Sequence, residues 1–195
     1  MDLSQYKSQY PALFLNAMIE TFEREGGFVN HKHDPGGATN YGISLRFLRS
    51  AEPGALWDLD GDGDVDADDM KLLTIADALG LYYQHFWRPI ANYPLGDMTK
   101  VKHFDTRVNM GPKGSGKVLQ RALTSVLGTR VVDDGAVGPS TKKSMTLVQQ
   151  LNKERQWGLF FSYKSEQAGY YRSLITANSD FNSFRVGWMR RAYDL

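Results

Sequence analysis

The stretch 23-EREGGFVNHKHDPGGATNYGIS-44 places a glutamate at the end of an apolar helical run and follows it with a polar, glycine-rich segment. Apolar residues recur at helical spacing after Pro11, so residues 11–25 are predicted to form an amphipathic helix. Glu25 therefore lies at the C-terminus of this helix. The glycines, asparagines and short apolar insertions of residues 28–43 predict turns and a small hairpin.

This arrangement is typical of acid catalysis. A carboxyl group at a helix C-terminus faces the negative end of the helix dipole, and Phe22 and Phe28 are placed to remove water from it. Both effects raise the pKa of Glu25, as a general acid requires. Asp34 follows after eight intervening residues and Thr39 comes five residues later. Hydrolysis of a glycosidic bond requires an acid that protonates the leaving oxygen and a second carboxylate opposite it.

A second motif, 58-DLDGDGDVDADD-69, matches the calcium-loop template position by position, with Gly63 at the sharp turn. Seven aspartates in twelve residues repel one another unless a divalent cation compensates them. We therefore expect a structural Ca²⁺ ion, although a solvated acidic loop is the simpler alternative. Aspartate at the last position resembles the calcium repeats of dockerin modules, which pair two such loops. The predicted metal ligands are Asp58, Asp60, Asp62, Asp64, Asp66 and Asp69.

The net charge of +1 hides an asymmetry between the halves of the chain. Residues 1–100 carry 8 Lys and Arg against 15 Asp and Glu, whereas residues 101–195 carry 15 against 7. The basic second half favours polyanions such as acidic wall polymers or anionic outer-membrane lipid, and a solvated basic surface explains it equally well. No stable protein partner or nucleic acid is implied.

The remaining elements are expected to be mostly helical. Helices are predicted at residues 45–50, capped by Ser44, and at 74–87, capped by Thr74. Further helices are predicted at 115–128, 139–174 and 180–193, with a glycine-rich loop at 133–139. The absence of cysteine excludes a disulfide framework and a thiolate metal site. Neither a signal peptide nor an apolar run long enough to span a bilayer is found.

Several strings together resemble one family. The string E-G-G-F-V-N…D-P-G-G-A-T-N-Y-G-I is similar to glycoside hydrolase family 108, the N-acetylmuramidases common among phage endolysins. The aromatic run at residues 82–90 resembles the Y-W-x-P-I helix of that family. Segments 104-FDTRVNMGP-112 and 133-DDGAVGPST-141, with the aromatic C-terminal segment, resemble the peptidoglycan-binding region that accompanies it. The aspartate loop is a departure from the family pattern.

The resemblance implies a mainly α, lysozyme-like catalytic domain at residues 1–102, with the calcium loop as an insertion, and a helical peptidoglycan-binding domain at 103–195. It implies hydrolysis of the β-1,4 bond between N-acetylmuramic acid and N-acetylglucosamine, with Glu25 as proton donor. Asp34 and Thr39 are assigned by likeness to phage lysozymes. The protein would then accumulate in the cytoplasm of an infected bacterium and act in the periplasm after release.

Other assignments stay open at this stage. His31, His33 and Asp34 would be the ligands of a zinc-dependent amidase or peptidase, and a non-catalytic wall-binding module is a third possibility. Tyr41 and Asn40 are the aromatic and amide residues best placed to contact sugar. The tryptophans, Trp157 among them, are expected in the core.

Overall fold

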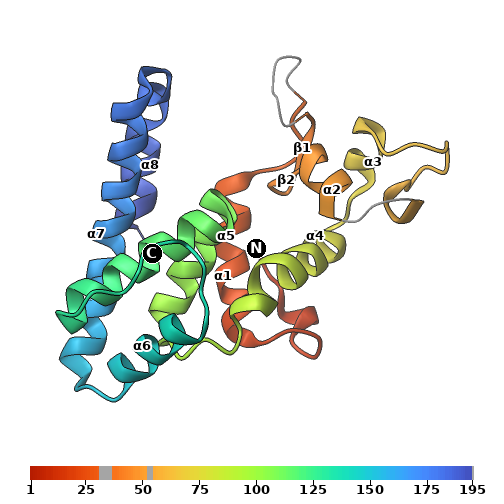
Figure 1. The fold of residues 1–195 in the computed structure, drawn as a ribbon. Helices are drawn as coiled ribbons and strands as arrows, with labels where there is room; N and C mark the ends of the chain where they lie inside the picture. The colour runs from red at the N-terminus through yellow and green to blue at the C-terminus, as the bar shows by residue number, and fades with distance from the viewer. Residues whose placement is uncertain (31–36, 52–54, 195) are drawn as a thin grey trace. The chain divides into compact units, whose positions relative to one another are not determined.

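The computed structural model describes residues 1–30, 37–51 and 55–194. The chain divides into two compact units, Met1–Pro89 and Ile90–Leu195, which we call unit 1 and unit 2. The boundary predicted near residue 102 falls inside a long helix of unit 2. Over these described residues the structure is mainly helical with one small antiparallel sheet, which confirms the predicted fold class (Figure 1).

Unit 1 combines short helices with one hairpin. The helix expected at residues 11–25 is present as α1, and Ser44 and Thr74 precede helices as predicted. Helix α4 continues directly into a π-helical turn, η3. In chain order the elements are η1 (Ser4–Tyr6), α1 (Ala12–Glu25), β1 (Thr39–Asn40), β2 (Ile43–Ser44), α2 (Leu45–Ala51), η2 (Ala55–Trp57), α3 (Ala67–Leu72), α4 (Ile75–Tyr82) and η3 (Tyr83–Trp87). The short helix η4 (Arg88–Ile90) crosses the boundary to unit 2.

The core of unit 1 forms where α1 packs against α4 and η3 through aromatic rings. Phe14 is fully buried, and its ring centroid lies 5.2 Å from that of Tyr83 and 5.5 Å from that of Trp87. Farther along α1, the ring centroid of Phe22 lies 6.2 Å from that of Tyr82. These contacts fix α1, and with it the backbone at Glu25, against the rest of the unit.

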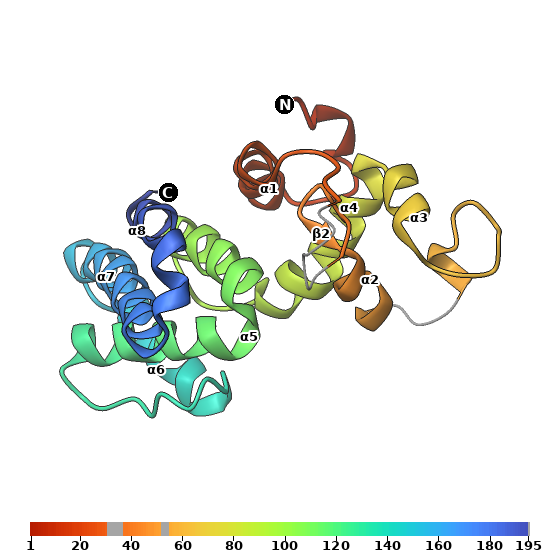
Figure 2. The ribbon, with the colours of Figure 1, turned by 90° about the horizontal axis from the view of Figure 1, so that it is seen from above.

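Unit 2 consists of long helices: α5 (Asp97–Leu127), α6 (Pro139–Gln149), α7 (Lys153–Ala177), η5 (Ser179–Phe184) and α8 (Arg185–Tyr193). Helix α7 lies beside α8 in both views and also packs on α5 (Figure 1, Figure 2). The prediction of a single helix at residues 139–174 is wrong. The helix is interrupted at residues 150–152, where the Asn152 side chain accepts a hydrogen bond from Arg155 N–H and caps a new helix.

Helix α5 is longer than the predicted segment 115–128, since it begins at Asp97 and bends near its middle. Gly111 has φ of +72°, outside the helical region, and Pro112 starts the second part. Proline is compatible with the first turn of a helix because its missing N–H is not needed there. The hydroxyl of Ser115 donates to the carbonyl oxygens of Gly111 and Pro112, which stabilises the bend.

Polar side chains are buried between α5, α7 and α8. The ammonium of Lys102 is completely buried and donates to the carbonyl oxygens of Arg191 and Asp194, the latter at 2.7 Å. Asp105 accepts a hydrogen bond of 3.1 Å from the Arg191 guanidinium. Backbone carbonyls and a paired carboxylate thus compensate the burial of these charges and fix α8 on α5.

His103 lies in the same core. Its Nδ1 is 2.9 Å from the Tyr163 hydroxyl, and burial, with a smaller contribution from the charge of Arg107, lowers the pKa of His103 to about 3. The imidazole is therefore neutral near neutral pH. Among the described residues, no helix is both long and apolar enough to cross a membrane.

Candidate active site

The candidate acid lies where α1 ends. Glu25 is the last residue of the helix, and Gly26 leaves it with φ of +73° while its N–H donates to the Phe22 carbonyl oxygen. This confirms the predicted position at a helix C-terminus. The side chain of Glu25 lies outside the described residues, as do His31, His33 and Asp34 entirely.

Thr39 is brought back toward this helix end by backbone pairing. Val29 and Thr39 exchange both N–H···O bonds, at 2.8 and 2.7 Å, so Thr39 lies opposite a residue only four positions beyond Glu25. On its other side, Thr39 pairs with Ser44 in the β1–β2 hairpin. The Thr39 side chain is half-buried, and its backbone is fixed between two neighbouring segments.

The turn of the hairpin is strained at Tyr41. Tyr41 has φ of +50° and Gly42 has φ of +76°, as a two-residue type I′ turn requires. Tyrosine at positive φ costs about 1–3 kcal/mol, and such residues cluster at functional sites. The Tyr41 ring packs 5.8 Å from Phe22, one turn before Glu25, and the Tyr82 hydroxyl donates to the Tyr41 carbonyl oxygen. Tyr41 is thus held beside the end of α1.

Asn40 has a role that the sequence did not reveal. Its side chain is buried, and its amide donates a hydrogen bond of 2.7 Å to the Met70 carbonyl oxygen in α3. This bond connects the hairpin to the helix that closes the aspartate loop. The amide NH₂ of Asn40 therefore serves the architecture of unit 1.

The aspartate loop, residues 58–69, is organised by hydrogen bonds between its carboxylates and its own backbone. Both oxygens of Asp58 accept, from the N–H groups of Gly61 and Gly63 at 2.8 and 3.0 Å. Asp69 accepts from Leu59 N–H at 2.5 Å and from Asp66 N–H at 2.7 Å. The loop is therefore folded around its first and last carboxylates.

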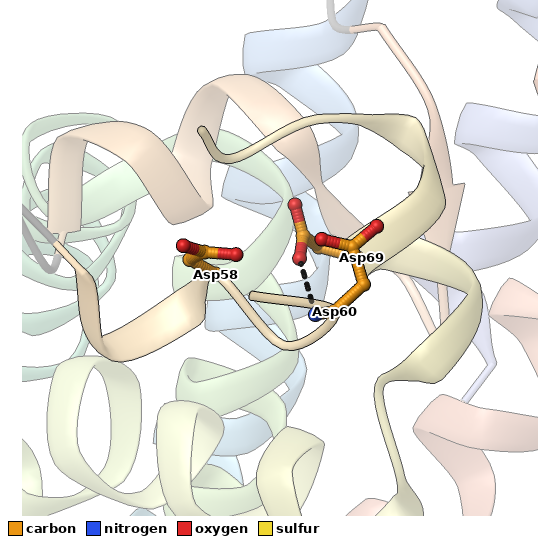
Figure 3. A group of neighbouring side chains, drawn as sticks. All are labelled: Asp58, Asp60 and Asp69. Atoms are coloured by element: carbon orange, nitrogen blue, oxygen red, sulfur yellow. Dashed lines mark hydrogen bonds between the residues drawn. The ribbon is translucent and has the colours of Figure 1, made fainter. Parts of the chain in front are cut away.

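Two groups of carboxylates form within this loop and share Asp69. Ligand oxygens of Asp58, Asp60 and Asp69 lie within 4.8 Å of one another, and so do those of Asp64, Asp66 and Asp69. Figure 3 shows the first group and the hydrogen bond of 3.3 Å from Asp60 N–H to Asp69. Of the predicted ligands, only Asp62 belongs to neither group of the described residues. Several carboxylates around one small volume suit a hard cation that prefers oxygen ligands.

The pKa shifts of Asp60 and Asp64 in the aspartate loop also favour a bound cation. Repulsion from Asp62, with smaller contributions from burial and Asp66, raises the pKa of Asp64 above its usual value. The N–H of Asp62 lowers the pKa of Asp60, but burial and the surrounding carboxylates outweigh it, so the net shift is upward. Crowding therefore disfavours the ionised form of these two groups, and a bound cation would relieve it.

The glycine-rich loop of unit 2 is organised differently, around Gln120. The buried Gln120 amide donates to the Asp134 carboxylate at 2.9 Å and accepts from Gly135 N–H at 2.8 Å. Asp133 accepts a hydrogen bond of 2.7 Å from Arg121. A glutamine on the apolar face of a helix was the signal for this role, and sequence reasoning passed over it.

Two known families together match most of the chain. The family described as "Glycosyl hydrolase 108" matches residues 18–111, and the one described as "Predicted Peptidoglycan domain" matches residues 115–193. A solved structure titled "Structure of Brucella abortus SagA" is similar at 26% identity with a TM-score of 0.65, covering 94% of this chain and 91% of that one. No curated protein matches the sequence.

Proposed function

We propose that the protein cleaves the β-1,4 bond between N-acetylmuramic acid and N-acetylglucosamine. Residues 18–111 match the glycosyl hydrolase 108 family and residues 115–193 match a predicted peptidoglycan domain, which supports this proposal. A role in peptidoglycan degradation follows from the two families together. The bond, the residues and the biological setting are our proposal.

In the proposed mechanism, Glu25 protonates the departing glycosidic oxygen. Asp34 and Thr39 position the attacking water or stabilise the oxocarbenium-like transition state. The observation that carries this assignment is the pairing of Val29 with Thr39, which returns the chain to the end of α1. The strained Tyr41, packed on Phe22 beside the same helix end, supports its assignment as a sugar contact.

Mass spectrometry of purified wall digested by wild type and by Glu25→Gln tests this proposal. General acid catalysis contributes about 10²–10⁴-fold to rate, so we expect at least a hundredfold loss with an unchanged fold. Glu23→Gln is the matched control, because Glu23 lies in the same helix with an exposed side chain. Full activity of Glu25→Gln would exclude Glu25 as the acid.

The products also separate the rival chemistries. New reducing sugar ends indicate a glycosidase, whereas new free amines indicate a zinc-dependent amidase or peptidase that uses His31, His33 and Asp34. Loss of lysis by Glu25→Gln with retained wall binding would exclude a non-catalytic wall-binding module. Analysis of the anomeric configuration of the first product separates inversion from retention.

We also propose that the aspartate loop binds one Ca²⁺ ion with a structural role. The two carboxylate groups that share Asp69 and the upward pKa shifts of Asp60 and Asp64 support this. When bound, the ion would supply positive charge that offsets the repulsion and hold the loop between η2 and α3. Calorimetric titration of Ca²⁺ into chelator-treated protein should give one site per chain, and Asp58→Asn with Asp60→Asn should abolish it.

The proposed setting is host lysis by a phage-type endolysin that reaches the wall after the inner membrane is breached. Bacteria that express the protein should remain intact until a membrane-permeabilising agent is added, and should then lyse. The same culture expressing Glu25→Gln should survive the agent as well as cells without the protein. Lysis without the agent would contradict this setting.

A further inference from the structure

A cavity of about 310 Å³ lies in unit 2, between the first turn of α5 and the first turns of α7. Its volume falls at the lower end of the roughly 300–1,000 Å³ typical of small-molecule sites, which is suited to one sugar-sized group. The lining includes charged, polar and aromatic side chains, namely Asp97, Thr99, Lys153, Gln156, Trp157 and Phe160. No residue of the candidate active site belongs to this lining.

One aromatic side chain of the cavity lining, Trp157, is exposed in a way that packing does not explain. Trp157 was expected in the core, and this expectation is wrong, since 48% of its surface is accessible. Phe161 is 61% accessible and stacks on Trp157 with ring centroids 6.0 Å apart and planes inclined by 26°. Phe160, which is buried, meets Trp157 edge to face at 6.1 Å and supports it from the protein side.

A rigidly supported indole at a cavity mouth is a platform for a sugar ring. One face of a hexopyranose presents mainly C–H groups, which pack on the electron-rich face of an aromatic ring while the hydroxyl and amide groups point to polar neighbours. Trp157 supplies a large contact area with only two side-chain torsions to fix, so little entropy is lost on binding.

The polar part of the lining favours a neutral ligand. Gln156 is fixed because its amide donates to the carbonyl oxygens of Gln149 and Leu151, both at 3.0 Å. Asp97 and Lys153 contribute one negative and one positive charge, so the lining has no net charge. A strongly acidic wall polymer or a charged stem peptide would lack a matching excess of charge here.

We propose that this cavity is a glycan subsite in which an N-acetylated sugar of the peptidoglycan strand stacks on Trp157. The proposal rests on the proposed function, since it takes the wall as the substrate. It assigns the wall contact of unit 2 to the beginning of α7, apart from the glycine-rich loop, whose aspartates are already paired with Arg121 and Gln120.

The test is co-sedimentation of the protein with purified sacculi, in a Glu25→Gln background so that the wall stays intact. Trp157→Ala should weaken binding by about tenfold, the loss expected for a buried aromatic contact of roughly 1.4 kcal/mol. Tyr193→Ala is the matched control, because Tyr193 is an equally exposed aromatic residue of unit 2 outside the cavity. The soluble trisaccharide of β-1,4-linked N-acetylglucosamine should compete with sacculi for binding.

The outcomes separate this proposal from the proposed function. Trp157→Ala binding as tightly as its parent would overturn the subsite, as would competition by free stem peptide and not by the trisaccharide. Absence of new reducing ends with wild type would instead overturn the proposed function. Circular dichroism checks that Trp157→Ala is folded, and Trp157→Leu, which keeps apolar bulk and removes the aromatic face, carries the test if it is not. The proposal fails if Trp157→Leu also binds normally.

Discussion

Two loops rich in aspartate and glycine differ in what compensates their carboxylates. In unit 1, the aspartate loop directs its carboxylates at its own backbone N–H groups and at one another. In unit 2, Asp133 is paired with Arg121 and Asp134 with the amide of Gln120. The same residue types therefore meet very different electrostatic surroundings.

The pKa shifts of Asp64, Asp133 and Asp134 express this difference, whereas at Asp69 burial is outweighed by backbone N–H groups, which lower its pKa. Repulsion between neighbours raises the pKa of Asp64, whereas the Arg121 hydrogen bond lowers the pKa of Asp133 and the Gln120 hydrogen bond lowers that of Asp134. In the unit 2 loop, Arg121 and Gln120 already compensate the two carboxylates, so no added ion is needed there. The unit 1 loop keeps an unbalanced negative charge, and for that reason only the first loop is a candidate for a cation.

The largest effect expected from this comparison is that of chelation. If calcium is present at a thousandfold above its dissociation constant, its removal costs about 4 kcal/mol of unfolding free energy. Hydrogen exchange should show the loss in residues 58–72 and leave residues 115–145 unchanged. Added calcium should restore protection, and equal exchange with and without chelator would remove the distinction between the loops.

A substitution in α5 should break the second loop without any dependence on calcium. A Cβ atom at Gly116 would lie 2.2 Å from the Gly135 carbonyl oxygen, so the helix and loop backbones cannot both keep their places. We expect Gly116→Ala to cost about 3 kcal/mol in chemical denaturation. Gly187→Ala is the control, since a Cβ atom there meets nothing within 4 Å in α8. Equal stabilities of the two variants would contradict the close approach.

Chelation is expected to destabilise unit 1, whereas acid is expected to destabilise unit 2. The pKa of His103 is lowered by burial to about 3 in the folded protein, while an unfolded histidine titrates near 6.5. As the pH falls, His103 therefore gains a proton in the unfolded state before it does in the folded state. The free energy of unfolding of unit 2 should decrease by about 2 kcal/mol between pH 7 and 5. His103→Gln should flatten this dependence in denaturant melts of the whole protein. A profile as steep as that of the wild type would assign the loss to other groups.

The smallest effect concerns the ion pair of the second loop. Arg121 and Asp133 are 2.7 Å apart, but both side chains are 40% exposed, so solvent screens the pair. Arg121→Ala should cost less than about 1 kcal/mol. A loss as large as that of Gly116→Ala would mean that this ion pair, and not backbone packing, stabilises the loop.

Much of the fold followed from periodicity and capping residues in the sequence. The helix ending at Glu25 and the caps at Ser44 and Thr74 are local features, and each was predicted correctly. The start of α5 at Asp97 was missed because Gly111 and Pro112 interrupt it, and local signals treat such a pair as a boundary. The break before Asn152 was missed for the converse reason, since apolar residues continue on both sides of it.

The candidate site was predictable only in its chemistry. The residue types around Glu25 indicated acid catalysis, but the pairing of Val29 with Thr39 depends on a turn that no local pattern determines. The bond from Asn40 to Met70 joins residues thirty positions apart, and the exposure of Trp157 depends on which face of α7 the other helices cover. Such facts arise from tertiary packing, so a sequence read on its own provides no access to them.

The buried Lys102 has a practical consequence for handling the protein. Its ammonium relies on carbonyl oxygens from Arg191 and Asp194, so the last turn of the chain belongs to the interior of unit 2. Removing or displacing residues 191–194 would take away two hydrogen-bond acceptors of this buried cation and loosen α8. Truncations or fusions that disturb α8 should therefore be avoided, and mass spectrometry of each preparation should show that residues 191–194 are intact.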